Sequence, residues 1–556
     1  MLTGKFFLKF FLFLLITINI FSLSFFDDED PAELAAMIVS EMSDDQALAQ
    51  TFMLGWVGAE PSPLILDWIH ERNIGGVKIF GWNTSDTTFL AQTVGELQKH
   101  ALSTQFGIPL LVATDQEGGW VRHVKGATSE TPGNMAIGAS GYPMDSYRSG
   151  YYIGRELALL GINMNFAPAV DIYTRRDSVL IGTRSFGADP VNTGILGAAF
   201  VRGLEASGVI ATAKHFPGHG DTDLDSHGVL PRIDVPFETL WERELIPYRF
   251  MVREGLQVIM SGHLAFPQTE AGETPASLSS WFLRDLLRDR MGYTGLVITD
   301  DLMMNGATMY AGSLSRAARA ALLAGNDIIM LSRTPFLFDP VWTSLIQSMK
   351  DDPGFNHVVR ESAQRILEVK LKCLKGEGSV PFIPDLAKVD EGLPDPEGAA
   401  FFLDLAARSV TIIKGENIIP LTNEKAGRVL LAGRYQDFFN AGEKAFPNSS
   451  FFRFANRSAT DAVLRELANL ARSADTIIFC LADAADLPFL NSLRSLGKRV
   501  IIFSVLSPVY IEEASWADGA IAVYSYAPES FIAGFSAILG RIPANGRIPF
   551  PFARDN

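Results

Sequence analysis

Residues 209–220 read VIATAKHFPGHG, and this stretch decides the fold. Its first five residues are small or β-branched, which predicts a strand buried on both faces, as strands are in a parallel sheet covered by helices. The proline and glycines that follow exclude a regular helix and predict a loop. Lys214 and His215 therefore lie at the carboxyl end of a buried strand.

Seven other apolar runs are similar to this one and alternate with longer amphipathic stretches. The alternation predicts parallel strands covered by helices. We expect an α/β fold in which the runs form a (β/α)8 barrel of the TIM type, whose active sites lie at the carboxyl ends of the strands. The predicted strands are 53–58, 75–80, 109–115, 163–171, 209–215, 256–263, 295–301 and 326–331.

A second domain is predicted beyond the barrel. The helical stretch 357–375 closes the barrel region, which we place at 33–375, and glycine- and proline-bearing sequence predicts a linker at 376–395. Further buried runs then predict a smaller open α/β sandwich domain at 396–556. These runs are 409–415, 427–433, 475–482, 498–506 and 519–526.

Residues 1–26 have the pattern of a signal peptide. Lys5 and Lys9 precede an apolar run, and Ser22 and Ser24 supply the small residues that a signal peptidase reads. An uncleaved N-terminal anchor is the alternative, and it would be the only membrane contact. We therefore expect an exported protein, either periplasmic or extracellular.

Composition narrows the class of protein. With 47% hydrophobic and 20% charged residues, the chain is typical of a globular protein with sizeable cores. The net charge of -16 argues against nucleic acid as a partner and against anionic membrane surfaces. Cys373 and Cys480 are the only cysteines and form neither a disulfide framework nor a CxxC metal site.

The loop after His215 carries a candidate acid/base pair. Asp225 and His227 are two residues apart, so the carboxylate can bond one imidazole nitrogen while the other faces a substrate. A turn-capping aspartate beside a surface histidine is the structural alternative. A metal site would add His215 and His219 to this pair. The spacing disfavours it, because the HxxxH pair encloses proline and glycine and has no glutamate base.

Two other segments place charged groups at strand ends. The run 297–301 reads VITDD, where Asp300 is nearer the strand end as a nucleophile and Asp301 could equally cap the next helix. The segment 115–122 reads DQEGGWVR and combines a carboxylate, a guanidinium and an aromatic ring. Sugar recognition uses these groups, although a structural turn explains the segment as well.

Together these segments resemble glycoside hydrolase family 3, in its branch of bacterial β-N-acetylglucosaminidases. The KHFPGHG…DSH string carries the resemblance, and DQEGG, IGTRSFG and TDDLMM occur in the family's order. The resemblance covers the barrel region and implies that Asp300 is the nucleophile and that His227, oriented by Asp225, is the acid/base. Trp120 stands where many relatives have an arginine. The residues implied to hold the hydroxyls of the terminal sugar are Asp115, Arg122, Arg184, Lys214 and His215.

The resemblance implies a glycoside hydrolase, a retaining exo-β-N-acetylglucosaminidase that removes terminal β-linked N-acetylglucosamine from cell-wall fragments or chito-oligosaccharides. Catalysis would pass through a covalent glycosyl-Asp300 intermediate and needs neither a metal nor an organic cofactor. One alternative is a family 3 β-glycoside phosphorylase, because a histidine acid/base leaves room for an anionic acceptor. A β-glucosidase and an inactive exported sugar-binding protein are the others.

Overall fold

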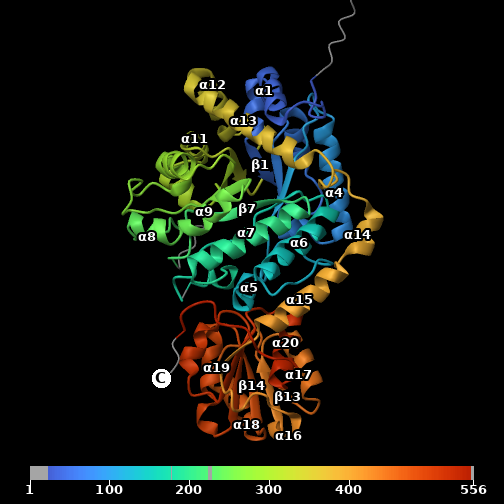
Figure 1. The fold of residues 1–556 in the computed structure, drawn as a ribbon, viewed down its shortest axis with the longest axis vertical. Helices are drawn as coiled ribbons and strands as arrows, with labels where there is room; N and C mark the ends of the chain where they lie inside the picture. The colour runs from blue at the N-terminus through green and yellow to red at the C-terminus, as the bar shows by residue number, and fades with distance from the viewer. Residues whose placement is uncertain (1–22, 177, 223–227, 553–556) are drawn as a thin grey trace, which may run out of the picture.

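The computed structural model describes residues 23–176, 178–222 and 228–552, which form two units along the chain (Figure 1). In the first unit, parallel strands close into a barrel in the order β1-β10-β9-β8-β7-β6-β3-β2. Each predicted barrel run overlaps one of these strands, so the predicted barrel is confirmed. The strands are β1 (Phe52–Gly55), β2 (Gly76–Ile79), β3 (Leu111–Thr114), β6 (Met164–Asn165), β7 (Ile210–Phe216), β8 (Val258–Ser261), β9 (Leu296–Asp301) and β10 (Ile328–Leu331).

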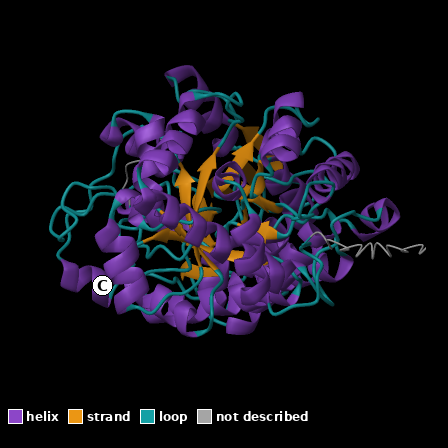
Figure 2. Ribbon diagram, turned by 90° about the horizontal axis from the view of Figure 1, so that it is seen from above, coloured by secondary structure: helices purple, strands orange, loops and turns teal. Residues whose placement is uncertain are grey.

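Helices enclose the barrel, as the view from above shows (Figure 2). A Cβ on Gly203 would lie 2.0 Å from the carbonyl oxygen of Tyr147, and one on Gly150 would lie 2.3 Å from that of Phe200. Any side chain at these glycines would collide with backbone, so α6 and α7 pack backbone against backbone. The enclosing helices include α4 (Thr87–Leu102), α6 (Pro143–Leu159), α7 (Pro190–Ala206), α9 (Leu245–Arg253), α11 (Leu314–Ala324), α12 (Pro340–Asp351) and α13 (Pro353–Leu374).

Side chains along each barrel strand alternate between the interior and the helices. On β9, Leu296 and Ile298 join the cluster that fills the barrel, whereas Val297 packs in the cluster formed with the helices. The same alternation continues to the end of β9, so its even-numbered residues point into the barrel and its odd-numbered residues point toward the helices. Polar residues on the inward set therefore meet above the apolar filling, at the carboxyl end of the barrel.

One element of the barrel unit was not predicted. Residues after β3 form a small antiparallel hairpin of β4 (Gln116–Gly118) and β5 (Val121–Arg122). Its turn uses Gly118 and Gly119 at φ angles of 89° and 62°, a conformation that glycine adopts without steric cost. The two glycines of DQEGG thus fold the segment back over the barrel mouth.

The second unit is an open sheet in the order β11-β16-β15-β14-β12-β13, with apolar clusters on both faces. All neighbouring strands are parallel except β11 and β16. β13 was not predicted, because it is a short edge strand with mostly exposed side chains. The strands are β11 (Thr411–Lys414), β12 (Val429–Gly433), β13 (Ser450–Arg453), β14 (Thr476–Leu481), β15 (Arg499–Ser504) and β16 (Gly519–Ala522).

Helices α14 (Leu386–Gly392) and α15 (Pro396–Ser409) join the two units, and α14 lies within the predicted linker. Arg408 of α15 forks onto Asp145 of the barrel unit at 2.7 and 3.0 Å. Tyr524, just after β16, packs in one cluster with Met135 of α5 (Asn134–Ser140). The carboxyl ends of the second sheet therefore face the barrel unit (Figure 1).

The described residues include no helix that is both long and apolar enough to cross a lipid bilayer. Residues 1–22, which make up most of the predicted signal peptide or anchor, lie outside the described part of the chain. The predicted export of the protein is therefore untested by the fold.

Candidate active site

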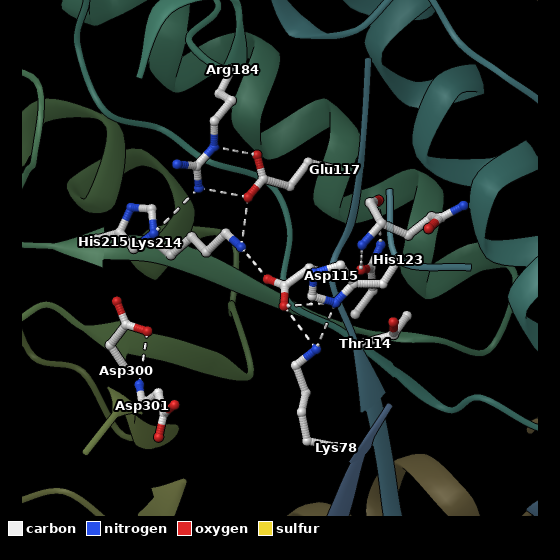
Figure 3. A network of polar contacts seen from close by, with 12 residues as sticks. Lys78, Thr114, Asp115, Glu117, His123, Arg184, Lys214, His215, Asp300 and Asp301 are labelled. Carbon is white, nitrogen blue, oxygen red and sulfur yellow. Dashed lines mark hydrogen bonds and ion pairs between the residues drawn. The ribbon is translucent and has the colours of Figure 1, made fainter. Parts of the chain in front are cut away.

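Four barrel strands turn charged side chains into the interior at their carboxyl ends. Lys214 follows the inward Ile210 by four residues on β7, and Asp300 follows the inward Ile298 by two on β9. Asp115 directly follows β3, and Lys78 is on β2. Their common direction results from the two-residue period of a strand, and Figure 3 shows the charged groups gathered at the barrel mouth.

Lys214 and Arg184 hold two carboxylates between them. The Lys214 ammonium contacts Asp115 and lies 2.6 Å from Glu117 Oε1. Arg184 donates to the same glutamate from Nε (2.8 Å) and Nη2 (2.7 Å). Burial alone would raise the pKa of Asp115, but the ammonium groups of Lys214 and Lys78 lower it well below its usual range. Asp115 is therefore ionised at neutral pH.

Lys78, on β2, joins this cluster through Asp115. Its side chain is fully buried, and Nζ lies 2.8 Å from Asp115 Oδ2 and 3.2 Å from His123 Nδ1. Burial and the neighbouring Lys78 cation lower the pKa of His123 to about 4. His123 is therefore neutral at physiological pH, and its Nδ1 accepts a hydrogen bond from Lys78, because an ammonium can only donate.

His215 is held by a buried carboxylate that belongs to another loop. Asp171 Oδ2 lies 2.8 Å from His215 Nδ1, while Oδ1 accepts the backbone N–H groups of His215 (3.2 Å) and His219 (2.7 Å). On the other side of the ring, Arg184 Nη2 lies 3.4 Å from Nε2. Arginine can only donate, so Nε2 is the acceptor and the proton is on Nδ1.

The geometry distinguishes the adjacent aspartates of β9. Asp301 Oδ1 accepts the backbone N–H groups of Met303 (3.0 Å) and Ser332 (3.1 Å), which stabilises the loops after β9 and β10. Asp300 points into the barrel, and the Asp301 N–H donates to its Oδ1 at 2.8 Å. Burial would raise the pKa of Asp300, yet the nearby His215 and His263 rings, the Asp301 N–H and the Lys214 ammonium together lower it. Asp300 is thus the ionised carboxylate that faces the barrel interior.

Comparison with known proteins identifies the family. The model of the glycosyl hydrolase family 3 N terminal domain matches residues 45–369. The chain belongs to glycosyl hydrolase family 3. It is 32% identical to the beta-hexosaminidase A of Pseudoalteromonas piscicida, over 68% of this chain and 65% of that protein. The aligned part is thus slightly less than two thirds of that relative.

A second relative of this family 3 chain is the beta-N-acetylglucosaminidase/beta-glucosidase of Cellulomonas fimi, which is 30% identical over 73% of this chain and 70% of that protein. Among solved structures, the family 3 beta-N-acetylglucosaminidase of Paenibacillus sp. str. FPU-7 superposes with a TM-score of 0.83 at 27% identity. That superposition covers 92% of this chain and 99% of the other, so it includes both units.

The structure brings most of the predicted sugar-binding residues together. Asp115, Arg184, Lys214 and His215 belong to one connected cluster, near Asp300 (Figure 3). Arg122 does not join it, because its guanidinium contacts Glu130 (3.1 Å) and the Thr128 carbonyl oxygen (3.3 Å). Arg122 is the last residue of β5, so it is the hairpin that places its guanidinium beside these two groups. The sugar contact predicted for Arg122 stays a prediction.

The predicted acid/base pair, Asp225 and His227, lies outside the described residues, so its roles stay predictions. A metal site was the alternative for this loop. Within the described residues, no group of three or more metal-binding side chains is close enough to hold an ion. The arrangement of His215 explains that histidine without a metal, because Asp171 and Arg184 occupy its two ring nitrogens.

Sequence reasoning missed Lys78, Glu117 and Asp171. Lys78 is the single charged residue of an otherwise apolar strand, and a buried lysine requires a partner, so its position was a usable signal. Asp171 ends the predicted run 163–171, and the rule that selected Asp115 applied to it equally. Glu117 lies in β4, two residues beyond Asp115, so the two-residue period of a strand was its signal.

Proposed function

We propose that this family 3 chain is a retaining exo-β-N-acetylglucosaminidase with Asp300 as its nucleophile. The observation that carries the proposal is the position of Asp300, an inward-facing carboxylate at the carboxyl end of β9 beside a cluster of cationic and imidazole groups. A nucleophilic carboxylate must be ionised before it attacks, and the lowered pKa of Asp300 satisfies that requirement.

In the first half-reaction, an Asp300 oxygen bonds to the anomeric carbon while the bond from that carbon to the leaving oxygen breaks. The leaving oxygen takes a proton from His227, which Asp225 orients. In the second half-reaction, water gives a proton to His227 and its oxygen attacks the same carbon, releasing Asp300. Two inversions at one carbon retain the configuration.

The cluster beside Asp300 supplies the groups that would bind the terminal sugar. Arg184 and Lys214 can donate hydrogen bonds to sugar hydroxyls and Asp115 can accept them, while His215 lies beside Arg184. Because carboxylates and cations hold one another in place, these groups are positioned before the sugar arrives, which reduces the entropic cost of binding. An arrangement of alternating donors and acceptors matches vicinal hydroxyl groups.

We further propose that the substrate is a cell-wall fragment or a chito-oligosaccharide that the exported protein meets outside the cytoplasm. The two relatives bear names that include hexosaminidase and N-acetylglucosaminidase, which supports N-acetylated sugars as the substrate class. The apolar, lysine-preceded N-terminal sequence supports export.

A hydrolysis panel tests the proposal. Aryl β-N-acetylglucosaminide should be turned over well and aryl β-glucoside poorly, with free N-acetylglucosamine of retained configuration as the product. Equal or reversed preference would establish the glucosidase alternative. A sugar phosphate formed in phosphate buffer would establish a phosphorylase, and binding without turnover would establish a sugar-binding protein.

A further inference from the structure

A cavity of about 300 Å³ lies in the second unit, outside the barrel site. It opens at the carboxyl ends of β12, β13 and β14, the end of the sheet that faces the barrel unit. Its volume is at the lower end of the range for small-molecule sites and suits one sugar-sized ring. Its lining residues are Arg434, Tyr435, Phe454, Ala455, Asn456, Arg457, Ala485, Asp486 and Phe489.

The cavity is at the point where the chain changes direction across the sheet. β12 and β14 are neighbours, but α17 (Gln436–Ala445) follows β12 on one face and α19 (Leu487–Asn491) follows β14 on the other. Helices that leave neighbouring strands toward opposite faces open a crevice between the strand ends. In open α/β sheets this crevice is where ligands bind.

Charged groups from both strands meet across the crevice. Arg434, after β12, forks onto Asp483, after β14, at 2.9 and 3.1 Å. It also contacts Asp486, whose other oxygen accepts the Ala482 N–H at 2.8 Å. Asp486 is buried, whereas the side chains of Asp483 and Arg434 keep 34% and 27% of their surface exposed. Arg434 lines the cavity, and Asp483 bonds to it from outside the lining, so a ligand in the cavity can reach the exposed pair through Arg434.

Aromatic rings form the walls. Phe454 stacks on Phe489 with ring centroids 4.5 Å apart, and Tyr435 stacks on Tyr526 at 5.4 Å, both with an interplanar angle of 17°. Asn456 lies at the exposed rim and holds its backbone at a φ angle of 60°. Phe454 and Phe489 are almost fully buried, and Phe454 also stacks on Phe479 at 5.4 Å, so the apolar surface open to the cavity comes from the half-buried Tyr435. Arg434 and Asp486 offer planar hydrogen-bonding groups beside it.

We propose that this crevice binds a neutral carbohydrate ring, at a site separate from the barrel. The carboxylate and guanidinium of the exposed pair offer acceptors and donors to adjacent hydroxyl groups, and the half-buried ring of Tyr435 suits the apolar edge of a sugar. Phosphate and other anions fit poorly, because Asp483 and Asp486 outnumber Arg434, and Arg457 pairs with Glu466 at 2.6 Å. The barrel cluster shares none of these residues.

Hydrogen exchange with chitotriose as the probe tests this site, and the choice of probe rests on the proposed function. The full chain carries Asp300→Asn so that the probe is not consumed. Chitotriose at ten times its Kd should slow exchange by about tenfold in three segments of the second unit. These segments are 433–436, 454–457 and 482–489. Segments 113–118 and 210–217 report the barrel site in the same experiment.

Asn456→Gly is the main variant, because glycine adopts the same positive φ without strain. It should weaken protection of the three second-unit segments while leaving the barrel segments protected. Asn73→Gly is the matched control, since Asn73 has the same φ of 60° but lies in the barrel unit. Asp483→Asn, which removes the exposed charge, should weaken the same protection more strongly.

Protection confined to the barrel segments would overturn the crevice site and leave the proposed function intact. Unchanged protection of the second-unit segments in both Asn456→Gly and Asp483→Asn would also overturn it. In the native Asp300 background, Asn456→Gly should hydrolyse an aryl β-N-acetylglucosaminide at the wild-type rate, because the aglycone and sugar of this small substrate fit within the barrel site alone.

Discussion

Replacing Asp171 with asparagine should impair catalysis through His215, although Asp171 faces no substrate. Asp171 accepts three N–H groups, from the His215 ring and from the backbones of His215 and His219. Asparagine has one acceptor oxygen, so its NH2 group must face either the ring N–H or the two backbone N–H groups. Each orientation opposes donor to donor, and at least one hydrogen bond to a charged acceptor is lost.

A hydrogen bond to a charged group contributes about 1.5–3 kcal/mol. If the free energy of that lost hydrogen bond no longer holds His215 in place in the transition state, kcat/KM should fall by about 10- to 150-fold, at about 1.4 kcal/mol per tenfold. The ring cannot escape by changing tautomer, because a proton on Nε2 would face the Arg184 guanidinium. Steady-state kinetics with an aryl β-N-acetylglucosaminide would measure the fall, and the thermal midpoint would record any loss of folding.

Asp327→Asn is the matched control. Asp327 is equally buried and bonds to Arg288 and Arg365, but it precedes β10 at the amino end of the barrel. Its substitution should lower the thermal midpoint and keep kcat/KM within about threefold of wild type. The reasoning fails if Asp171→Asn keeps wild-type kcat/KM, or if both variants lose activity equally.

The remaining predictions concern the nucleophile, the acid/base and one buried amine. Asp300→Ala should abolish turnover, whereas Asp301→Ala should mainly lower the free energy of unfolding in urea, by about 1–3 kcal/mol for each of two orphaned N–H groups. His227→Ala should release a burst of dinitrophenol from an activated substrate and then turn over slowly, with azide restoring the rate; the absence of azide rescue would contradict its role. Burial lowers the pKa of Lys370, which donates to Gln50, to about 7. The unfolded chain then binds the additional proton between pH 7 and 10.5, so stability should rise across that window. Below pH 7, Lys370→Met should raise the free energy of unfolding measured in urea, by up to about 5 kcal/mol. An identical pH dependence in wild type and variant would contradict this account.

The barrel could be predicted from sequence because both faces of its strands are buried. Runs such as VIATA and LVIT therefore signal strands without any alternation of polar residues. The short strand β6 sits inside a predicted run of nine residues, because the chain there leaves the sheet after Asn165. β13 was not predicted, because it is an edge strand whose four residues, SFFR, are mostly exposed and do not form a continuous apolar run.

The candidate site was predictable where a charged residue directly ended a strand. Lys214, Asp115 and Asp300 were found in this way, and the alternation of β9 gives a physical reason to separate Asp300 from Asp301. Contacts made across loops were not predictable. Arg184, which holds Glu117, comes from a separate loop 67 residues further along the chain, and the order of the residues does not show that the two meet.

The burial of Lys214 and Glu117, with exposed side-chain fractions of 3% and 1%, also affects how the site responds to its medium. Mobile ions screen exposed charges over about 8–10 Å at moderate salinity, but they do not enter a packed interior. The attractions that position Asp115 and Arg184 are therefore nearly independent of ionic strength. A site built in this way keeps its shape in dilute and saline surroundings alike, where one held by surface lysines would loosen as salt rises.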